Sequence, residues 1–221
     1  MNVVMDSKER IARRVALEVE RDSLVNLGIG LPSMVANYLP KDVHVFFQAE
    51  NGVIGLGARP PEGMEDPDLT DAGGGFVTAV PGAASIDSAM SFGLIRGGHL
   101  DMTVLGGLQV DSNGHLANWM VPGKMVPGMG GAMDLVAGAK KVVVAMVHAA
   151  RGESKIVPEC TLPLTALRRV DLIVTEMAVI EPTDDGLVLR EVAEGVTVDD
   201  VRAATAADLL VPVAPGQMRL A

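Results

Sequence analysis

The stretch VHVFFQAENG, residues 43–52, contains an apolar run that stops abruptly at a polar turn. Residues 43–47 are mostly apolar and rich in valine and phenylalanine, which predicts a short buried strand. Asn51-Gly52 is a strong turn signal, so the chain is expected to reverse just after Glu50. Ligands of open α/β sheets gather at the carboxyl ends of strands. Glu50 therefore stands where such a sheet would place a reactive carboxylate.

The rest of the chain alternates between expected strands and expected helices. Strands are expected at residues 23–27, 76–80, 102–105, 108–110, 116–119, 142–147, 172–180 and 186–192, the last as an edge strand. Helices are expected after Asp6 and at residues 32–38, 83–95, near Asp134 and at 197–209, with an exposed loop at 59–71. This order predicts an α/β fold with a mostly parallel central sheet and flanking helices. No repeat or linker interrupts it, so residues 1–221 are expected to form one domain.

The composition argues against some classes of binding partner. The formal net charge of −10 argues against nucleic acid and against an anionic membrane surface as partners. The first 14 residues, MNVVMDSKERIARR, have no apolar signal core, and no apolar run approaches the ~18 residues that suggest a membrane span. We therefore expect a cytoplasmic protein. The single cysteine, Cys160, excludes a disulfide within the chain.

Two glycine motifs resemble nucleotide-binding loops and fit them poorly. Gly28-Ile-Gly30 follows an expected strand, but Ser33 stands where the dinucleotide fingerprint needs a third glycine or an alanine. Gly123-Lys124 ends like a phosphate-binding loop, but Met125 replaces the serine or threonine that would bind magnesium. The first motif leaves dinucleotide binding as a weak alternative, and the second is rejected.

Metal and thiol chemistry have little support. The four histidines form no close pair at metal-ligand spacing, and one cysteine cannot build a zinc cluster, so no metal is expected. A Cys160–His148 nucleophile pair is conceivable. A lone cysteine is more often a small buried hydrophobic residue.

Position alone does not make Glu50 catalytic, because glutamates before turns are often simply solvated. Its sequence context adds a resemblance. The run QAENGVIGLG, residues 48–57, closely resembles the S-E-N-G-x-x-G-x-G signature of the β-subunits of 3-oxoacid CoA-transferases, which include the succinate-dependent and 3-oxoadipate enzymes. Further matching runs are VPGA (80–83), SFGLIRGGH (91–99), LANWMVPGK (116–124), GMGGAMDLV (128–136), CTLPLT (160–165) and GVTVDD (195–200). The resemblance covers nearly the whole chain in order, and the fold it implies is shared with sugar-phosphate isomerases.

The resemblance implies roles for five residues. Glu50 matches the family's nucleophile, and Asn26 matches an active-site asparagine. Gly130 and Gly131 match a glycine-rich turn whose backbone amides face the thioester. Together with Asn51, these residues are expected to bind acyl-CoA. Coenzyme A is then a substrate, and no permanent cofactor is expected.

Two positions depart from the family pattern. Ala49 replaces the usual serine before the glutamate, and Gly74 stands where many relatives carry a lysine. The absence of that positive charge puts the usual dicarboxylate donor or acceptor in doubt.

The chemistry of a glutamate agrees with the resemblance. Its carboxylate is ionised at neutral pH and can attack a thioester without a separate general base. The product is an acyl-glutamyl anhydride, which the released CoA thiolate converts to a Glu50–CoA thioester. Backbone amides at Gly130 and Gly131 could stabilise the oxyanions that form on the way. Lys124, Lys140, Lys141 and Lys155 are candidate counter-charges for CoA.

The resemblance also implies a partner. In the family a separate α-subunit completes the site, so an α/β hetero-oligomer, α2β2, is expected, with acyl-CoA and a small carboxylic acid as substrates. Two alternatives stay open. Glu50 could serve as the proton-transferring base of a sugar-phosphate isomerase-like enzyme, or the chain could be a non-catalytic binding or regulatory protein of the same fold.

Overall fold

The computed structural model describes residues 5–40, 42–123 and 130–221. The strands are β1 (Ser23–Leu27), β2 (Val45–Ala49), β3 (Val53–Leu56), β4 (Ala79–Ser85), β5 (Met102–Leu105), β6 (Gln109–Asp111), β7 (Leu116–Ala117), β8 (Lys141–Ala145), β9 (Ala149–Ala150), β10 (Glu153–Ser154), β11 (Ile156–Val157), β12 (Leu172–Val174), β13 (Ala178–Thr183), β14 (Gly186–Val192), β15 (Leu209–Leu210) and β16 (Gly216–Gln217). The helices are α1 (Ser7–Ala16), the 3-10 helix η1 (Pro32–Tyr38), α2 (Ser88–Arg96), α3 (Ala132–Gly138) and α4 (Val198–Ala204).

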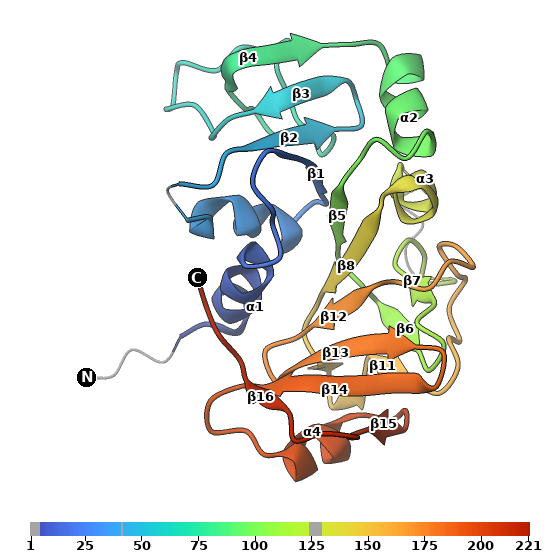
Figure 1. Cartoon of the computed structure of the whole chain (residues 1–221). Coiled ribbons are helices and arrows are strands. Elements are labelled where there is room, and N and C mark those ends of the chain that lie inside the picture. Colours follow the sequence, from blue (N-terminus) through green and yellow to red (C-terminus); the bar gives the residue numbers. More distant parts are fainter. Residues whose placement is uncertain (1–4, 41, 124–129) are drawn as a thin grey trace.

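Eleven of the described strands form one sheet, in the order β15-β14-β13-β12-β8-β5-β1-β2-β3-β4, with β16 also paired to β14. Its centre, β12-β8-β5-β1-β2, is entirely parallel. Antiparallel strands extend it at both ends, so that β4 and β15 lie far apart in Figure 1. The predicted α/β fold with a mostly parallel central sheet is confirmed. Since one sheet joins strands from both halves of the chain, we propose that residues 1–221 form a single domain.

Each face of the sheet carries its own hydrophobic core, as the alternation along β8 shows. Val142 and Val144 pack in the core that α2, α3 and α4 cover, whereas Val143 and Ala145 pack in the core that α1 and η1 cover. Side chains alternate between faces along a strand, so a continuously apolar run requires helices on both sides. Figure 1 shows α1 on one side of the central strands and α2 and α3 on the other.

Residues 172–180 form a hairpin, so the prediction of one continuous strand there is wrong. The strands β12 and β13 are antiparallel neighbours joined by a turn at Thr175. The Thr175 hydroxyl accepts hydrogen bonds from the amides of Met177 and Ala178, at 3.2 and 3.0 Å. A threonine hydroxyl that bonds nearby amides favours a turn, and here it outweighs the strand propensity of its neighbours.

Two helix boundaries and one edge-strand assignment also differ from the sequence prediction. Helix α2 begins at Ser88 instead of residue 83, because the preceding residues pair with β3 and Asp87 caps the helix through the amide of Met90. Helix α4 keeps its predicted cap, Thr197, but ends at Ala204, where Thr205 is extended. Strand β14 has the predicted bounds, yet it is not an edge strand, because β13 lies on one side of it and β15 and β16 on the other.

Within the described ranges, no helix combines the length and the apolar composition that a membrane crossing requires.

His148 provides a pH-dependent contribution to stability. Its ring is fully buried between the hydroxyls of Thr175 and Thr205, at 3.0 and 2.9 Å from Nδ1 and Nε2. Burial lowers its pKa from 6.5 to about 4, because the charged imidazolium loses its hydration. The neutral ring therefore stabilises the fold fully above pH 6.5, and this contribution falls as the pH drops towards 4.

We expect wild-type protein to lose roughly 2 kcal/mol of unfolding free energy from this residue between pH 7 and pH 5, since each pKa unit is worth about 1.4 kcal/mol. Urea unfolding at both pH values measures the loss. His148→Gln should flatten the pH dependence, whereas His44→Gln, at an exposed position, should leave it unchanged. An equal slope in wild type and His148→Gln would contradict the assignment.

Candidate active site

Three parallel strands bring the candidate residues to one edge of the sheet. β1, β2 and β5 end at Leu27, Ala49 and Leu105, and the residues that follow them line one cavity of about 600 Å³. Glu50 is among these residues, in agreement with its predicted position at a strand end. The structure adds that the carboxyl ends of three neighbouring strands meet at this cavity.

The Glu50 carboxylate is half-buried and held by Asn26. The amide nitrogen Nδ2 of Asn26 donates to Oε2 of Glu50 at 3.1 Å. Asn26 lies one residue before the end of β1, and its side chain is only 1% exposed. The structure thus joins two predicted site residues that are 24 positions apart in the sequence.

Gly131 lies directly against the same carboxylate. A Cβ atom built on Gly131 would stand 3.0 Å from Cγ of Glu50 and 3.2 Å from Oε1. Gly131 caps α3, and both Gly130 and Gly131 line the cavity. The absence of a side chain at 131 therefore leaves room for the carboxylate, a requirement that the sequence motif alone did not specify.

Asn51 points away from the carboxylate. Its side chain is exposed, and its amide nitrogen donates to the carbonyl oxygen of Thr70 at 2.8 Å. The contact connects the turn after β2 to the 59–71 loop, and Asn51 is not among the cavity-lining residues. A role of Asn51 in substrate binding stays a prediction.

The loop after residue 70 contributes a wall that the sequence analysis did not identify. Asp71 and Gly73 line the cavity, and Oδ1 of Asp71 accepts hydrogen bonds from the amides of Gly73 and Gly75, both at 2.8 Å. Gly74, the position of the family lysine, has φ +78°, a conformation that side chains rarely adopt. The aspartate followed by glycines is itself a turn signal, which could have identified this loop.

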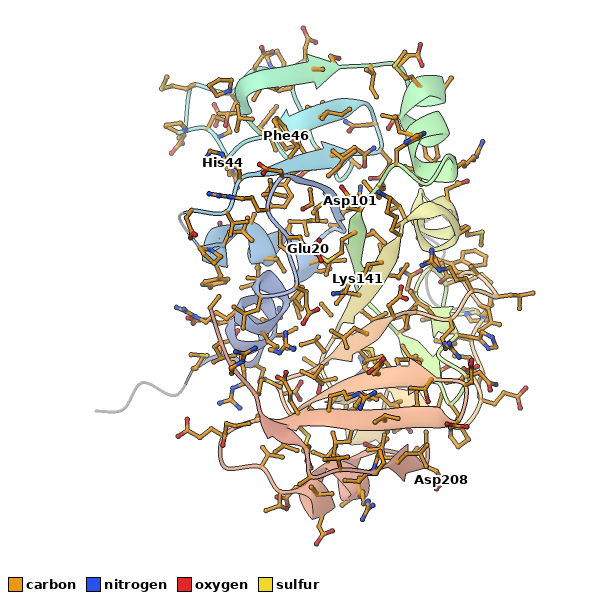
Figure 2. All side chains as sticks on the ribbon, in the orientation of Figure 1. Glu20, His44, Phe46, Asp101, Lys141 and Asp208 are labelled. Carbon is orange, nitrogen blue, oxygen red and sulfur yellow. The ribbon has the colours of Figure 1, made fainter. Side chains whose placement is uncertain are left out.

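The candidate counter-charges for CoA do not gather at this edge. Lys140 and Lys141 stand at the amino end of β8, where they pair with Asp101 and Glu18 at 2.7 and 2.5 Å. Asp101 and Lys141 are labelled in Figure 2. These two lysines are therefore at the opposite edge of the parallel strands from Glu50.

The structure also does not place the two other lysine candidates, Lys155 and Lys124, at the cavity as counter-charges for CoA. Burial lowers the pKa of Lys155, and this lysine does not line the Glu50 cavity. Lys124 lies outside the described residues, as do residues 125–129 before the predicted glycine-rich turn at Gly130 and Gly131.

The alternative Cys160–His148 pair is not formed. Cys160 donates its thiol to the carbonyl oxygen of His115 at 3.5 Å, whereas both ring nitrogens of His148 contact threonine hydroxyls. Burial, with a smaller contribution from nearby Asp111, raises the pKa of the Cys160 thiol to about 12. The thiol is protonated at neutral pH and is a poor nucleophile. Within the described parts of the chain, no three metal-ligating side chains are grouped to hold an ion.

Comparison with known proteins identifies the class. The model of the coenzyme A transferase family matches residues 8–204. A curated relative from Escherichia coli K12, acetate CoA-transferase subunit beta, is 58% identical over 92% of this chain and 93% of its own length. The mouse mitochondrial succinyl-CoA:3-ketoacid coenzyme A transferase 2B is 49% identical over 93% of this chain but only 40% of its own length.

The chain therefore belongs to the coenzyme A transferase family. The recognition of a β-type CoA-transferase subunit from the sequence is confirmed. A solved structure of an acyl-CoA transferase (YdiF) from E. coli O157:H7 has a TM-score of 0.76 over 99% of this chain and 44% of its own. At 22% identity this likeness concerns the fold alone.

A methyl group at position 131 is expected to displace the Glu50 carboxylate by a few tenths of an ångström. Because small misplacements of reacting groups are costly, Gly131→Ala should lower CoA-transfer activity roughly tenfold to a hundredfold in the complex with its partner subunit. Steady-state kinetics measure this effect.

Gly93→Ala is the matched control. A Cβ at this position in α2 meets nothing within 4 Å, and this variant should keep full activity. If Gly131→Ala has the same kinetics and the same melting temperature as wild type, the added methyl group does not displace the Glu50 carboxylate, and the prediction is wrong.

Proposed function

We propose that the chain transfers CoA from an acyl-CoA to a free carboxylic acid through covalent intermediates on Glu50. The observation that carries this proposal is the placement of the carboxylate. One oxygen is anchored by Asn26, and the other faces Gly131 in an open cavity at the sheet edge. A nucleophile needs this combination of a fixed orientation and a free reacting atom.

The reaction follows from the nucleophilicity of a carboxylate. A Glu50 oxygen attacks the thioester carbonyl, the C–S bond breaks, and an acyl-glutamyl anhydride and CoA thiolate result. The thiolate then attacks the glutamyl carbonyl, which releases the first carboxylic acid as its anion and leaves a Glu50–CoA thioester. The carboxylate of the acceptor acid reverses both steps, leaves as the new acyl-CoA and regenerates Glu50.

Each attack creates an oxyanion, and backbone amides supply its stabilisation. We assign this role to Gly130 and Gly131, because both line the cavity and Gly131 adjoins the glutamate side chain. The role of Asn26 is to fix the carboxylate through its bond to Oε2. Coenzyme A acts here as a substrate.

A partner subunit completes the enzyme in this proposal. The E. coli relative is named as a subunit beta, and the mouse relative is far longer than this chain. The described residues also enclose the cavity beside Glu50 only in part, as expected of a shared site. We propose an α/β assembly of the α2β2 type.

The acid substrate is proposed to be a small monocarboxylic or 3-oxo acid. Among the described residues of the cavity wall, the ionisable side chains are two carboxylates, Glu50 and Asp71, and none is basic. Six large aliphatic side chains also line it, beside alanines, glycines and the polar residues Ser33 and Asn118: Leu27, Ile29, Leu56, Leu105, Leu108 and Leu135. A short apolar acyl chain fits this lining, whereas a second carboxylate would face negative charge without a counter-ion.

Trapping of the intermediate tests the mechanism. The chain, co-expressed with its partner subunit, is mixed with acetoacetyl-CoA and analysed by mass spectrometry of the denatured protein. We expect a CoA adduct on Glu50 in wild type and in Cys160→Ala. Glu50→Gln should form none, because a carboxamide oxygen is a poor nucleophile. An adduct on another residue, or none during turnover, would overturn the proposal and favour an isomerase-like or non-catalytic protein.

Discharge of the trapped intermediate tests the substrate class. Acetate or acetoacetate should release CoA from Glu50 at least about tenfold faster than succinate at equal concentration, because the described wall offers no cation to a second carboxylate. The rate is measured by loss of the adduct mass over time. Equal rates with succinate would rule out the monocarboxylate assignment without affecting the covalent mechanism.

A further inference from the structure

A row of buried polar side chains crosses the sheet beneath Glu50. The strand register places Thr103 of β5 opposite Asn26 of β1, and Asn26 opposite Gln48 of β2. These side chains are 0%, 1% and 2% exposed, and Ser91 from α2, also 0% exposed, covers the end of the row. Polar groups this deep in a sheet are costly unless each forms a hydrogen bond.

The hydrogen bonds branch at the Asn26 amide, which donates both to the Glu50 carboxylate and to Gln48. Nε2 of Gln48 donates to Oγ of Ser91 at 2.8 Å, so that Oε1 of Gln48 faces Asn26. Nδ2 of Asn26 donates to this Oε1 at 3.0 Å and to Oε2 of Glu50 at 3.1 Å. On the other side, the hydroxyl of Thr103 donates to Oδ1 of Asn26 at 3.4 Å.

Only one orientation of the Asn26 amide satisfies this environment. The main-chain carbonyl of Gln48, 3.0 Å from Nδ2, and the Glu50 carboxylate can only accept hydrogen bonds. A flipped Asn26 would turn its oxygen towards both of them and leave two pairs of acceptors facing each other. The amide therefore presents its NH₂ group to Glu50.

The strand register explains why Gln48 can reach this amide. Gln48 belongs to β2, and Glu50 follows the end of that strand at Ala49, so both residues meet Asn26 at the same strand end. The register sets Asn26 directly beside Gln48, and the Gln48 side chain occupies the space between Asn26 and Ser91. Gln48 thus restrains the same Asn26 amide nitrogen that bonds Oε2 of Glu50.

We infer that Gln48 is a positioning residue for the reaction: through Asn26 it holds the Glu50 carboxylate in the orientation that attacks the thioester, and Ser91 fixes Gln48 in turn. This inference rests on the proposed nucleophilic role of Glu50. Gln48 contacts no reacting atom, so its effect is on the rate of the covalent step and not on CoA binding.

The test compares Gln48→Met, which preserves most of the side-chain volume and removes both amide contacts, with wild type in the complete complex. We expect kcat and the rate of Glu50–CoA adduct formation to fall about tenfold, with KM for acyl-CoA within about twofold. Ser91→Ala should give a smaller loss of the same kind.

A double-mutant cycle separates positioning from a general structural effect. If Gln48 acts through Asn26, then Gln48→Met should cost little further activity in an Asn26→Ala background. The inference would be overturned if the activity losses of Gln48→Met and Asn26→Ala added in the double mutant. It would also be overturned if the loss in Gln48→Met were explained by a lower melting temperature of that variant.

Gln109→Met is the matched control. It removes a glutamine whose Nε2 donates to Thr161 and whose Oε1 accepts from the amides of Thr161 and Leu162, away from the cavity. This variant should lower stability without lowering kcat. If wild type forms the Glu50 adduct and Gln48→Met forms it equally fast, the positioning role fails while the proposed function stands. If wild type forms no adduct, the proposed function itself fails.

Discussion

The parallel pairing of β1 with β2 and β5 is the constraint on which the site depends. It aligns Thr103, Asn26 and Gln48 across three neighbouring strands and brings Glu50 within hydrogen-bond distance of Asn26. A slip of one residue in β2 would turn Gln48 and Glu50 to the other face of the sheet. The apolar neighbours prevent this slip, because each face of the sheet already packs against its own helices.

The two edges of the parallel strands differ in the residues that they carry. At the amino edge, Lys141 bonds Glu18. Glu18 also bonds Arg14, whose guanidinium contacts both carboxylate oxygens of Glu191 in β14 at 2.8 Å. This network connects α1 to the sheet at both β8 and β14. At the carboxyl edge, glycines and short turns replace such pairs, so the backbone leaves space beside Glu50.

The Glu50 carboxylate is held at Oε2 by the buried Asn26 amide, while its other oxygen faces the cavity. The buried amides beneath it have all their partners, and no buried side-chain nitrogen or oxygen lacks a hydrogen bond in the described part of the chain. Such a satisfied network restricts rotation of Asn26 and, through it, of Glu50. Gly131 adds a steric limit on the other side, so a backbone position and a side-chain network together define one orientation of the Glu50 carboxylate.

The sequence by itself determined the α/β class, the family, most strand positions and the place of Glu50 at the end of a strand, because apolar periodicity and an ordered series of motifs are local properties. It did not determine the hairpin at Thr175, where a hydroxyl-bonded turn divides one apolar run. It also could not show that Lys140 and Lys141 lie at the edge opposite to Glu50, or that Gln48 and Ser91 support Asn26. These relations depend on strand order and register, which bring together residues tens of positions apart, and only the tertiary structure decides them.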